Sequence, residues 1–65
     1  MIKITLREKE IISWVAEGKT ALEIGVILGR SEHTIRKHVR NISEKLDVMN
    51  SAHLVAKAMR RGIIQ

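Results

Sequence analysis

The stretch from Ser31 to Leu46, SEHTIRKHVRNISEKL, constrains the fold most, because its residues separate cleanly into two faces of a helix. At ~100° per residue, four aliphatic side chains fall within an arc of roughly 60° and form an apolar seam: Ile35, Val39, Ile42 and Leu46. The opposite face carries four basic or imidazole side chains: His33, Arg36, Lys37 and Arg40. Ser31 suits the N-cap, and Glu32 follows where the helix dipole favours a negative charge. We predict a helix over 32–46 that is anchored on one side and cationic on the other.

Two capping boxes place two shorter helices before this one. Thr5 with Glu8 opens a helix over about 6–17, and Thr20 with Glu23 opens one over about 21–28. Gly29 then supplies a tight turn, and two helices joined by a short glycine-containing turn are typical of a helix-turn-helix. A glycine inside the second helix costs about 1 kcal/mol relative to alanine. We expect another helix to approach closely at that glycine, Gly25.

A fourth helix is predicted over about 51–61, with Asn50 or Ser51 as its cap and Gly62 at its end. Its apolar residues spread over roughly 200°, whereas one core contact needs little more than 100°. The excess is a candidate helix-to-helix dimer surface made of small or flexible side chains: Ala52, Val55, Ala56 and Met59. Alternatively, Ile63 and Ile64 fold back over it. The pattern as a whole predicts one all-α, four-helix domain over 1–65.

Charge favours a polyanionic partner. The 65 residues carry a net charge of +5 with a pI near 10.3. Between Arg30 and Arg40 four Arg or Lys residues face one acid, Glu32. The chain has no cysteine, no apolar run near the ~20 residues of a membrane span, and no signal peptide at its start. We therefore expect no membrane partner and a cytoplasmic, nucleoid-associated location.

The two arginines of the cationic face suit the major groove of double-stranded DNA. The forked guanidinium groups of Arg36 and Arg40 can each bind guanine O6 and N7. The competing interpretation is intrahelical pairing with Glu32 and Glu44, but such pairs contribute only ~0.3–0.5 kcal/mol. Lys37 is a point charge and suits a phosphate better than a base.

Catalysis and metal binding find no support in the sequence. No two histidines have i,i+4 spacing and no cysteine can assist them, so we expect no metal site and no cofactor. His33 either touches DNA or is solvated, His38 lies half-buried beside the seam, and His53 is solvated. Glycine-rich phosphate loops and facing carboxylate pairs are absent, so the chain is predicted not to be an enzyme and to have no catalytic residues.

Three segments resemble the LuxR-type (GerE-like) helix-turn-helix domain of bacterial transcription regulators: ITLREKEII, EGKTALEIGVILGRSEHTIRKHVRNISEKLDV and AMRRGII. The resemblance covers Ile4 to Ile64. It implies four helices, the third reading the major groove and the fourth forming a two-fold dimer. Trp14 with Gly18-Lys19-Thr20, and Ser51-Ala52-His53-Leu54, resemble the quorum-sensing subgroup that carries an acyl-homoserine-lactone-binding domain.

Matched by position, the resemblance implies a set of DNA contacts. Arg36, Lys37 and Arg40 match base- and phosphate-contacting sites, and Thr34 matches a phosphate contact. Lys19 and Thr20 match contacts at the start of the second helix, where backbone amides favour a phosphate. Three residues depart from the family pattern, which usually has proline, alanine and arginine at these positions: Leu6, Gly25 and Ser51.

Two functions remain open. The first is sequence-specific binding of double-stranded DNA in transcription regulation, with a weak homodimer on an inverted repeat and RNA polymerase as a further candidate partner. The second is an interaction module that pairs with a full-length regulator through the last helix and inhibits it. A sigma-factor promoter-reading domain ranks below both, because it lacks the extended apolar fourth helix. Met1 lies four residues before Thr5, so the chain can be free-standing or the C-terminal domain of a longer regulator.

Overall fold

The computed structural model describes residues 3–65 as four α-helices. In chain order they are α1 (Leu6–Ala16), α2 (Ala21–Leu28), α3 (Glu32–Leu46) and α4 (Ser51–Arg60). No β-strand occurs in residues 3–65, and the predicted all-α, four-helix class is confirmed. None of the helices in this part of the chain is long and apolar enough to cross a membrane.

Both capping boxes predicted from the sequence are present. Thr5 Oγ1 accepts from the Glu8 amide at 3.1 Å, and Glu8 Oε1 accepts from the Thr5 amide at 2.9 Å. Thr20 and Glu23 make the same two bonds at 3.1 and 2.9 Å. Each box satisfies two backbone donors that the first turn of a helix leaves free, and it thereby fixes where α1 and α2 begin.

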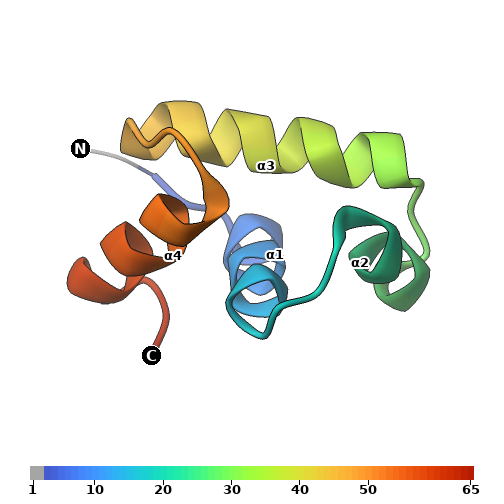
Figure 1. The fold of residues 1–65 in the computed structure, drawn as a ribbon, viewed down its shortest axis with the longest axis horizontal. Helices are drawn as coiled ribbons and strands as arrows, with labels where there is room; N and C mark the ends of the chain where they lie inside the picture. Colours follow the sequence, from blue (N-terminus) through green and yellow to red (C-terminus); the bar gives the residue numbers. More distant parts are fainter. Residues whose placement is uncertain (1–2) are drawn as a thin grey trace.

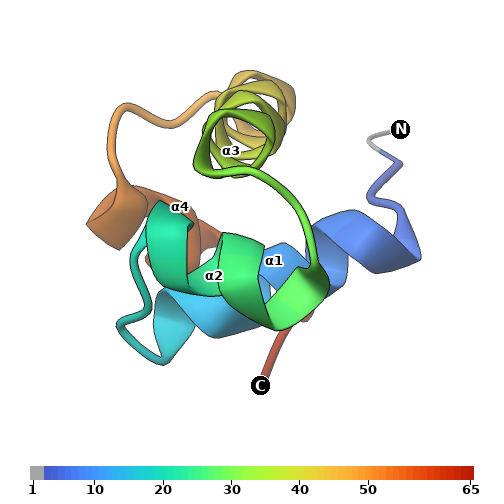
Figure 2. The ribbon, with the colours of Figure 1, turned by 90° about the vertical axis from the view of Figure 1, so that its right-hand side faces the viewer.

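The longest helix, α3, lies across the other three (Figure 1). When the molecule is turned by 90°, α1, α2 and α4 all lie on one side of it (Figure 2). α3 packs against each of these helices. Among residues 3–65, one long side of α3 therefore has no other helix over it.

The apolar seam of α3 forms the middle of the core. Ile35, Ile42 and Leu46 are completely buried, and Val39 is half-buried at the edge. The other helices supply the remaining fully buried side chains: Ile11 and Ile12 from α1, Ile24 from α2, Leu54 and Ala58 from α4. Because α3 contributes to the core along its whole length, its orientation is fixed by packing against all three supporting helices.

Gly25 lies where α2 meets the turn into α3. A Cβ atom at this position would lie 2.5 Å from the carbonyl oxygen of Arg30 and 3.3 Å from the carbonyl carbon of Ser31. The sequence predicted a close approach by another helix; the approach is instead made by the backbone of the turn, up to the first residue of α3. An alanine here would require the turn to shift, and this offsets the ~1 kcal/mol that glycine costs within a helix.

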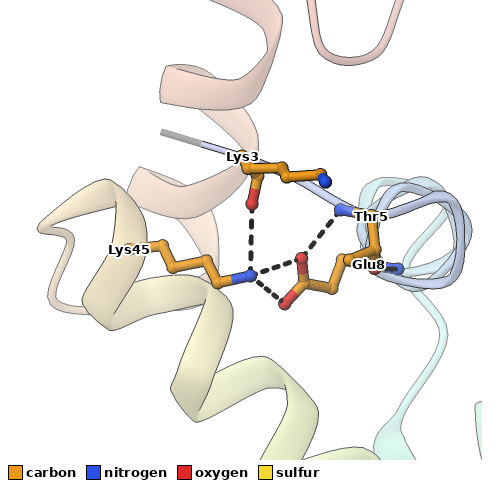
Figure 3. A network of polar contacts seen from close by, with 4 residues as sticks. All are labelled: Lys3, Thr5, Glu8 and Lys45. Carbon is orange, nitrogen blue, oxygen red and sulfur yellow. Dashed lines mark hydrogen bonds and ion pairs between the residues drawn. The ribbon is translucent and has the colours of Figure 1, made fainter. Parts of the chain in front are cut away.

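A polar network joins the start of α1 to the end of α3 (Figure 3). Lys45 Nζ donates to both carboxylate oxygens of Glu8 at 2.8 Å and to the carbonyl oxygen of Lys3 at 3.2 Å. Burial raises the pKa of the Glu8 carboxyl, but hydrogen bonds from Lys45 and Thr5 and the charge of Lys45 outweigh it, so the pKa lies below its ordinary value of 4.5. The network holds the C-terminal end of α3 against α1, a contact that the sequence did not predict.

The apolar excess on α4 remains open to solvent. Asn50 is the cap, accepting from the His53 amide at 2.9 Å. Among the four candidate dimer residues, Ala52 and Ala56 are exposed, Met59 is 53% exposed and Val55 is half-buried. Ile64 instead enters the core, and with Ile63 it lines a hollow beside α1. The C-terminal residues therefore leave this face largely uncovered.

Candidate nucleic-acid interface

The uncovered side of α3 carries the cationic face predicted from the sequence. His33, Arg36, Lys37 and Arg40 are all exposed, on the side opposite the buried seam. Thr34 and His38 are half-buried at its margins. A straight helix with a free outer side and a buried inner side has the shape that fits the major groove of B-DNA.

One flank of this face is hollowed where three helix ends meet. A hollow of about 420 Å³ has an apolar floor that includes Val15, Ile24 and Val39. Its polar rim brings together residues from three parts of the chain: Lys19, Thr20, Arg36, Arg40 and Ser51. Four of the seven predicted DNA-contacting residues thus line one surface, and the first residue of α4 joins them.

The other flank holds the remaining three predicted residues. His33, Thr34 and Lys37 line a second hollow, of about 340 Å³, together with His38 and Asn41. The predicted contacts therefore divide between the two sides of α3. In the major groove a helix lies between two phosphate backbones, so residues on opposite flanks face different strands.

The start of α2 presents hydrogen-bond donors to the first hollow, which Lys19, Thr20 and Ala21 line. Glu23 Oε1 accepts a hydrogen bond from the backbone amide of Thr20. Hydrogen bonds from this amide and from the Thr20 side chain lower the pKa of Glu23 below 4.5. Thr20 Oγ1 accepts from the Glu23 amide, and its own proton, directed at the Glu23 carboxylate, has to turn outward to donate to a phosphate. A phosphate at this position would therefore be bound by the Thr20 hydroxyl, the next free amides of the first turn and the Lys19 ammonium.

The start of α3 is capped in a way that leaves one hydroxyl proton free. Ser31 Oγ accepts from the Thr34 amide at 3.1 Å and donates to Thr34 Oγ1 at 2.9 Å. The Thr34 hydroxyl keeps a proton that can point outward. It is therefore able to donate to a phosphate without breaking the cap.

The two arginines of the face differ in their partners. Arg36 forms an ion pair with Glu32, with Nη2 at 2.7 Å and Nε at 3.2 Å from the same carboxylate oxygen. Within residues 3–65 Arg40 makes no ion pair, although Glu44 lies four residues further along α3. One of the two intrahelical pairs considered from the sequence is therefore present and the other is not.

Sequence reasoning did not anticipate the contributions of Ser51 and Asn41 to the two flanks. The sequence offers Ser51 as a helix cap and as a departure from the family's arginine, and nothing in its local pattern places it beside Lys19. Asn41 lies one helical turn after Lys37 on the same flank, a spacing that could have identified it. No three His, Cys, Asp or Glu side chains gather as a potential metal site in the described part of the chain.

Comparison with known proteins identifies the family. Residues 3–58 match the GerE family, described as bacterial regulatory proteins of the luxR family. The transcriptional activator protein SolR of Ralstonia solanacearum is 48% identical over 61 residues, which are 94% of this chain and 26% of SolR. The quorum sensing-dependent transcriptional regulator RpaR of Rhodopseudomonas palustris is 46% identical over 63 residues, or 97% of this chain and 26% of RpaR. The transcriptional activator LuxR of Aliivibrio fischeri is 41% identical over 61 residues, or 94% of this chain and 24% of LuxR.

Two solved structures contain a domain with the same fold as this chain. The response regulator ChrA of a heme-sensing two-component system matches 95% of this chain with 31% of its own, at a TM-score of 0.92 and 27% identity. The phage VqmA protein, solved as a complex with DPO, matches 97% of this chain with 29% of its own, at a TM-score of 0.85 and 32% identity. The chain spans about a quarter of the length of the curated relatives named above. It belongs to the luxR family of bacterial regulatory proteins, as a helix-turn-helix domain that binds DNA in transcription regulation and is not an enzyme.

Proposed function

We propose that α3 enters the major groove as the recognition helix, with Arg36 and Arg40 on base edges and the remaining predicted residues on the phosphates. The open cationic side of α3 between two hollows carries this proposal. Lys19 and Thr20 would hold one strand, while Thr34 and Lys37 would hold the other. His33, exposed near the start of α3, is assigned to the edge of the same interface.

The phosphate contacts can be tested by salt dependence. Lys37 is exposed and makes no ion pair in residues 3–65, so removing it should not disturb the fold. Lys37→Ala should weaken binding to all duplexes alike and reduce the slope of log K against log salt by about one unit. The measurement is a titration of random-sequence and preferred duplexes at several salt concentrations. An unchanged slope would remove Lys37 from the phosphate contacts.

We also propose that two copies of the domain pair through α4 on an inverted repeat. The candidate face has two exposed alanines that allow the backbones to approach closely. Stable interfaces bury about 1,200–2,000 Å² in total. One face of a helix of 10 residues supplies less, so the isolated domain should be a weak dimer or a monomer at micromolar concentration. DNA would then bring the copies together, with half-sites about one helical turn apart.

Charge placed on α4 tests this dimer. Val55→Asp should leave binding to a single half-site nearly unchanged and abolish cooperative binding to the full palindrome, because two carboxylates would meet at the two-fold axis. Val55 is half-buried, so Ala56→Asp, at an exposed position of the same face, repeats the test with less risk to the fold. Titrations of half and full sites in parallel give the readout. Unchanged cooperativity in both variants would place the dimer surface elsewhere.

We also propose that this chain acts in quorum-sensing-dependent transcription, in the cytoplasm and at the nucleoid, with RNA polymerase as a second partner. The names of SolR, RpaR and LuxR support this proposal, since they describe transcriptional activators and a quorum sensing-dependent regulator. The alternative, an inhibitory module that pairs through α4, is not favoured, because it gives no role to the open cationic side of α3.

A further inference from the structure

The ion pair between Glu32 and Arg36 lies on the side of α3 that faces DNA in the proposed complex. Glu32 is the first residue of α3, and its side chain is 42% exposed, while that of Arg36 is 67% exposed. A single carboxylate oxygen, Oε2, accepts from both Nε and Nη2 of Arg36. Neither group is buried in the free domain, so the pair has no evident role in the core.

The pair determines which edge of the guanidinium remains available. A guanidinium carries five N–H donors in one plane: the Nε side and the outer Nη1/Nη2 end each offer two parallel donors. Glu32 occupies the Nε side. The outer end stays free, and its two parallel donors match the O6 and N7 acceptors of guanine.

In the free domain the ion pair raises the population of Arg36 side chains whose outer end is free by only about twofold, as exposed i,i+4 pairs do. A bound duplex displaces water from the face, and the pair strengthens as the effective dielectric constant falls. The carboxylate also repels phosphate oxygens. Arg36 with Glu32 beside it is therefore disfavoured as a general phosphate contact.

We propose that Glu32 is a positioning residue that sets sequence specificity, by presenting the outer end of Arg36 to guanine and by opposing the use of Arg36 on phosphate. The inference rests on the proposed role of Arg36 as a base reader. Arg40, which has no ion pair within residues 3–65, lacks this constraint and can bind a base or a phosphate. The two arginines would thus differ in selectivity although their side chains are the same.

Three variants of the 65-residue chain separate orientation from charge. Glu32→Gln removes the charge and keeps the size, Glu32→Asp keeps the charge and shortens the reach, and Glu44→Gln removes an exposed charge of α3 that pairs with no arginine in the described residues. Dissociation constants are measured for a duplex selected from random sequences and for a scrambled duplex. Thermal unfolding followed by circular dichroism checks that each variant is folded.

We expect Glu32→Gln to bind the scrambled duplex about threefold more tightly, as one repulsive charge disappears, and to lose about tenfold in the ratio of specific to scrambled binding. Glu32→Asp should lose several-fold in this ratio with scrambled binding unchanged. Glu44→Gln should leave the ratio unchanged. A wild-type ratio in Glu32→Asp, or an equal gain on both duplexes in Glu32→Gln, would overturn the proposal.

Arg36→Ala distinguishes failure of this inference from failure of the proposed base contact. If Arg36→Ala lowers the ratio and the Glu32 variants do not, only the positioning role is wrong. If Arg36→Ala leaves the ratio unchanged, Arg36 is not a base reader and both proposals are wrong. If both proposals are correct, adding Glu32→Gln to Arg36→Ala should not lower the ratio of specific to scrambled binding further than Arg36→Ala alone does.

Discussion

Replacing Lys45 with methionine is expected to lower the free energy of unfolding by about 2 kcal/mol, within the range for a buried polar group that loses its partner. The Glu8 side chain is 8% exposed, and Lys45 donates to both of its oxygens. The loss should stay below the ~3–5 kcal/mol of a fully buried pair, because Glu8 keeps the Thr5 amide and water reaches the Lys45 site. Chemical denaturation followed by circular dichroism at neutral pH measures the difference.

The same variant should show a distinct pH dependence. The pKa of Glu8 is lowered in the folded protein, so its contribution to stability is fully present above the unfolded value of 4.5. The contribution disappears as pH falls through the lowered folded pKa, because the unfolded chain then binds the proton more readily. The stability deficit of Lys45→Met should therefore be largest at neutral pH and shrink on acidification below 4.5. The lowered pKa of Glu23 is common to both proteins and cancels in the difference.

Two further variants make this result specific to the network. Lys37→Met removes an exposed lysine of the same helix that has no ion pair in residues 3–65, and it should change stability by less than about 0.5 kcal/mol. Glu8→Gln combined with Lys45→Met should cost less than the sum of the single changes, because the two residues are in contact. Additive costs, or a deficit that is independent of pH, would contradict the assigned role of the pair.

Arg40→Ala is expected to cost ~1–3 kcal/mol in binding to the preferred duplex and much less on random DNA. Arg40 is exposed on the free side of α3 and makes no ion pair within the described residues. Its removal should therefore leave the fold intact, and the whole effect should appear in DNA binding. The physical reason is the loss of a forked donor pair that discriminates guanine from other bases.

Arg40→Lys is the matched control, because it keeps the charge and removes the fork. It should restore most of the binding to random DNA and little of the preference for the selected duplex. Competitive titrations with both duplexes measure the two quantities together. Equal losses on both duplexes in Arg40→Ala would instead make Arg40 a phosphate contact, consistent with its position beside Lys19 in the hollow.

The helices and the recognition face could be predicted from the sequence because their signals are local. Thr5 with Glu8 and Thr20 with Glu23 satisfy backbone donors three residues away, so a pair of side chains is enough to locate a helix start. The seam of α3 follows from the helical period alone, and its opposite face is then necessarily the exposed one. The assignment of contacts to individual residues of that face came from side-chain chemistry and from the family resemblance, and it stays a prediction.

The tertiary structure decided what depends on the placement of one helix against another. Apart from Glu23, α2 has apolar residues or glycine all around, and only the packing against α3 shows that Ile24 is buried while Leu22 is 58% and Val26 77% exposed. Lys45 and Glu8 lie 37 residues apart, and no local period relates them. Ser51 likewise reaches the hollow beside Lys19 because α4 starts there in space. Helical periodicity fixes which residues share a face, whereas the contacts between faces depend on crossing angles and turns that the local pattern does not encode.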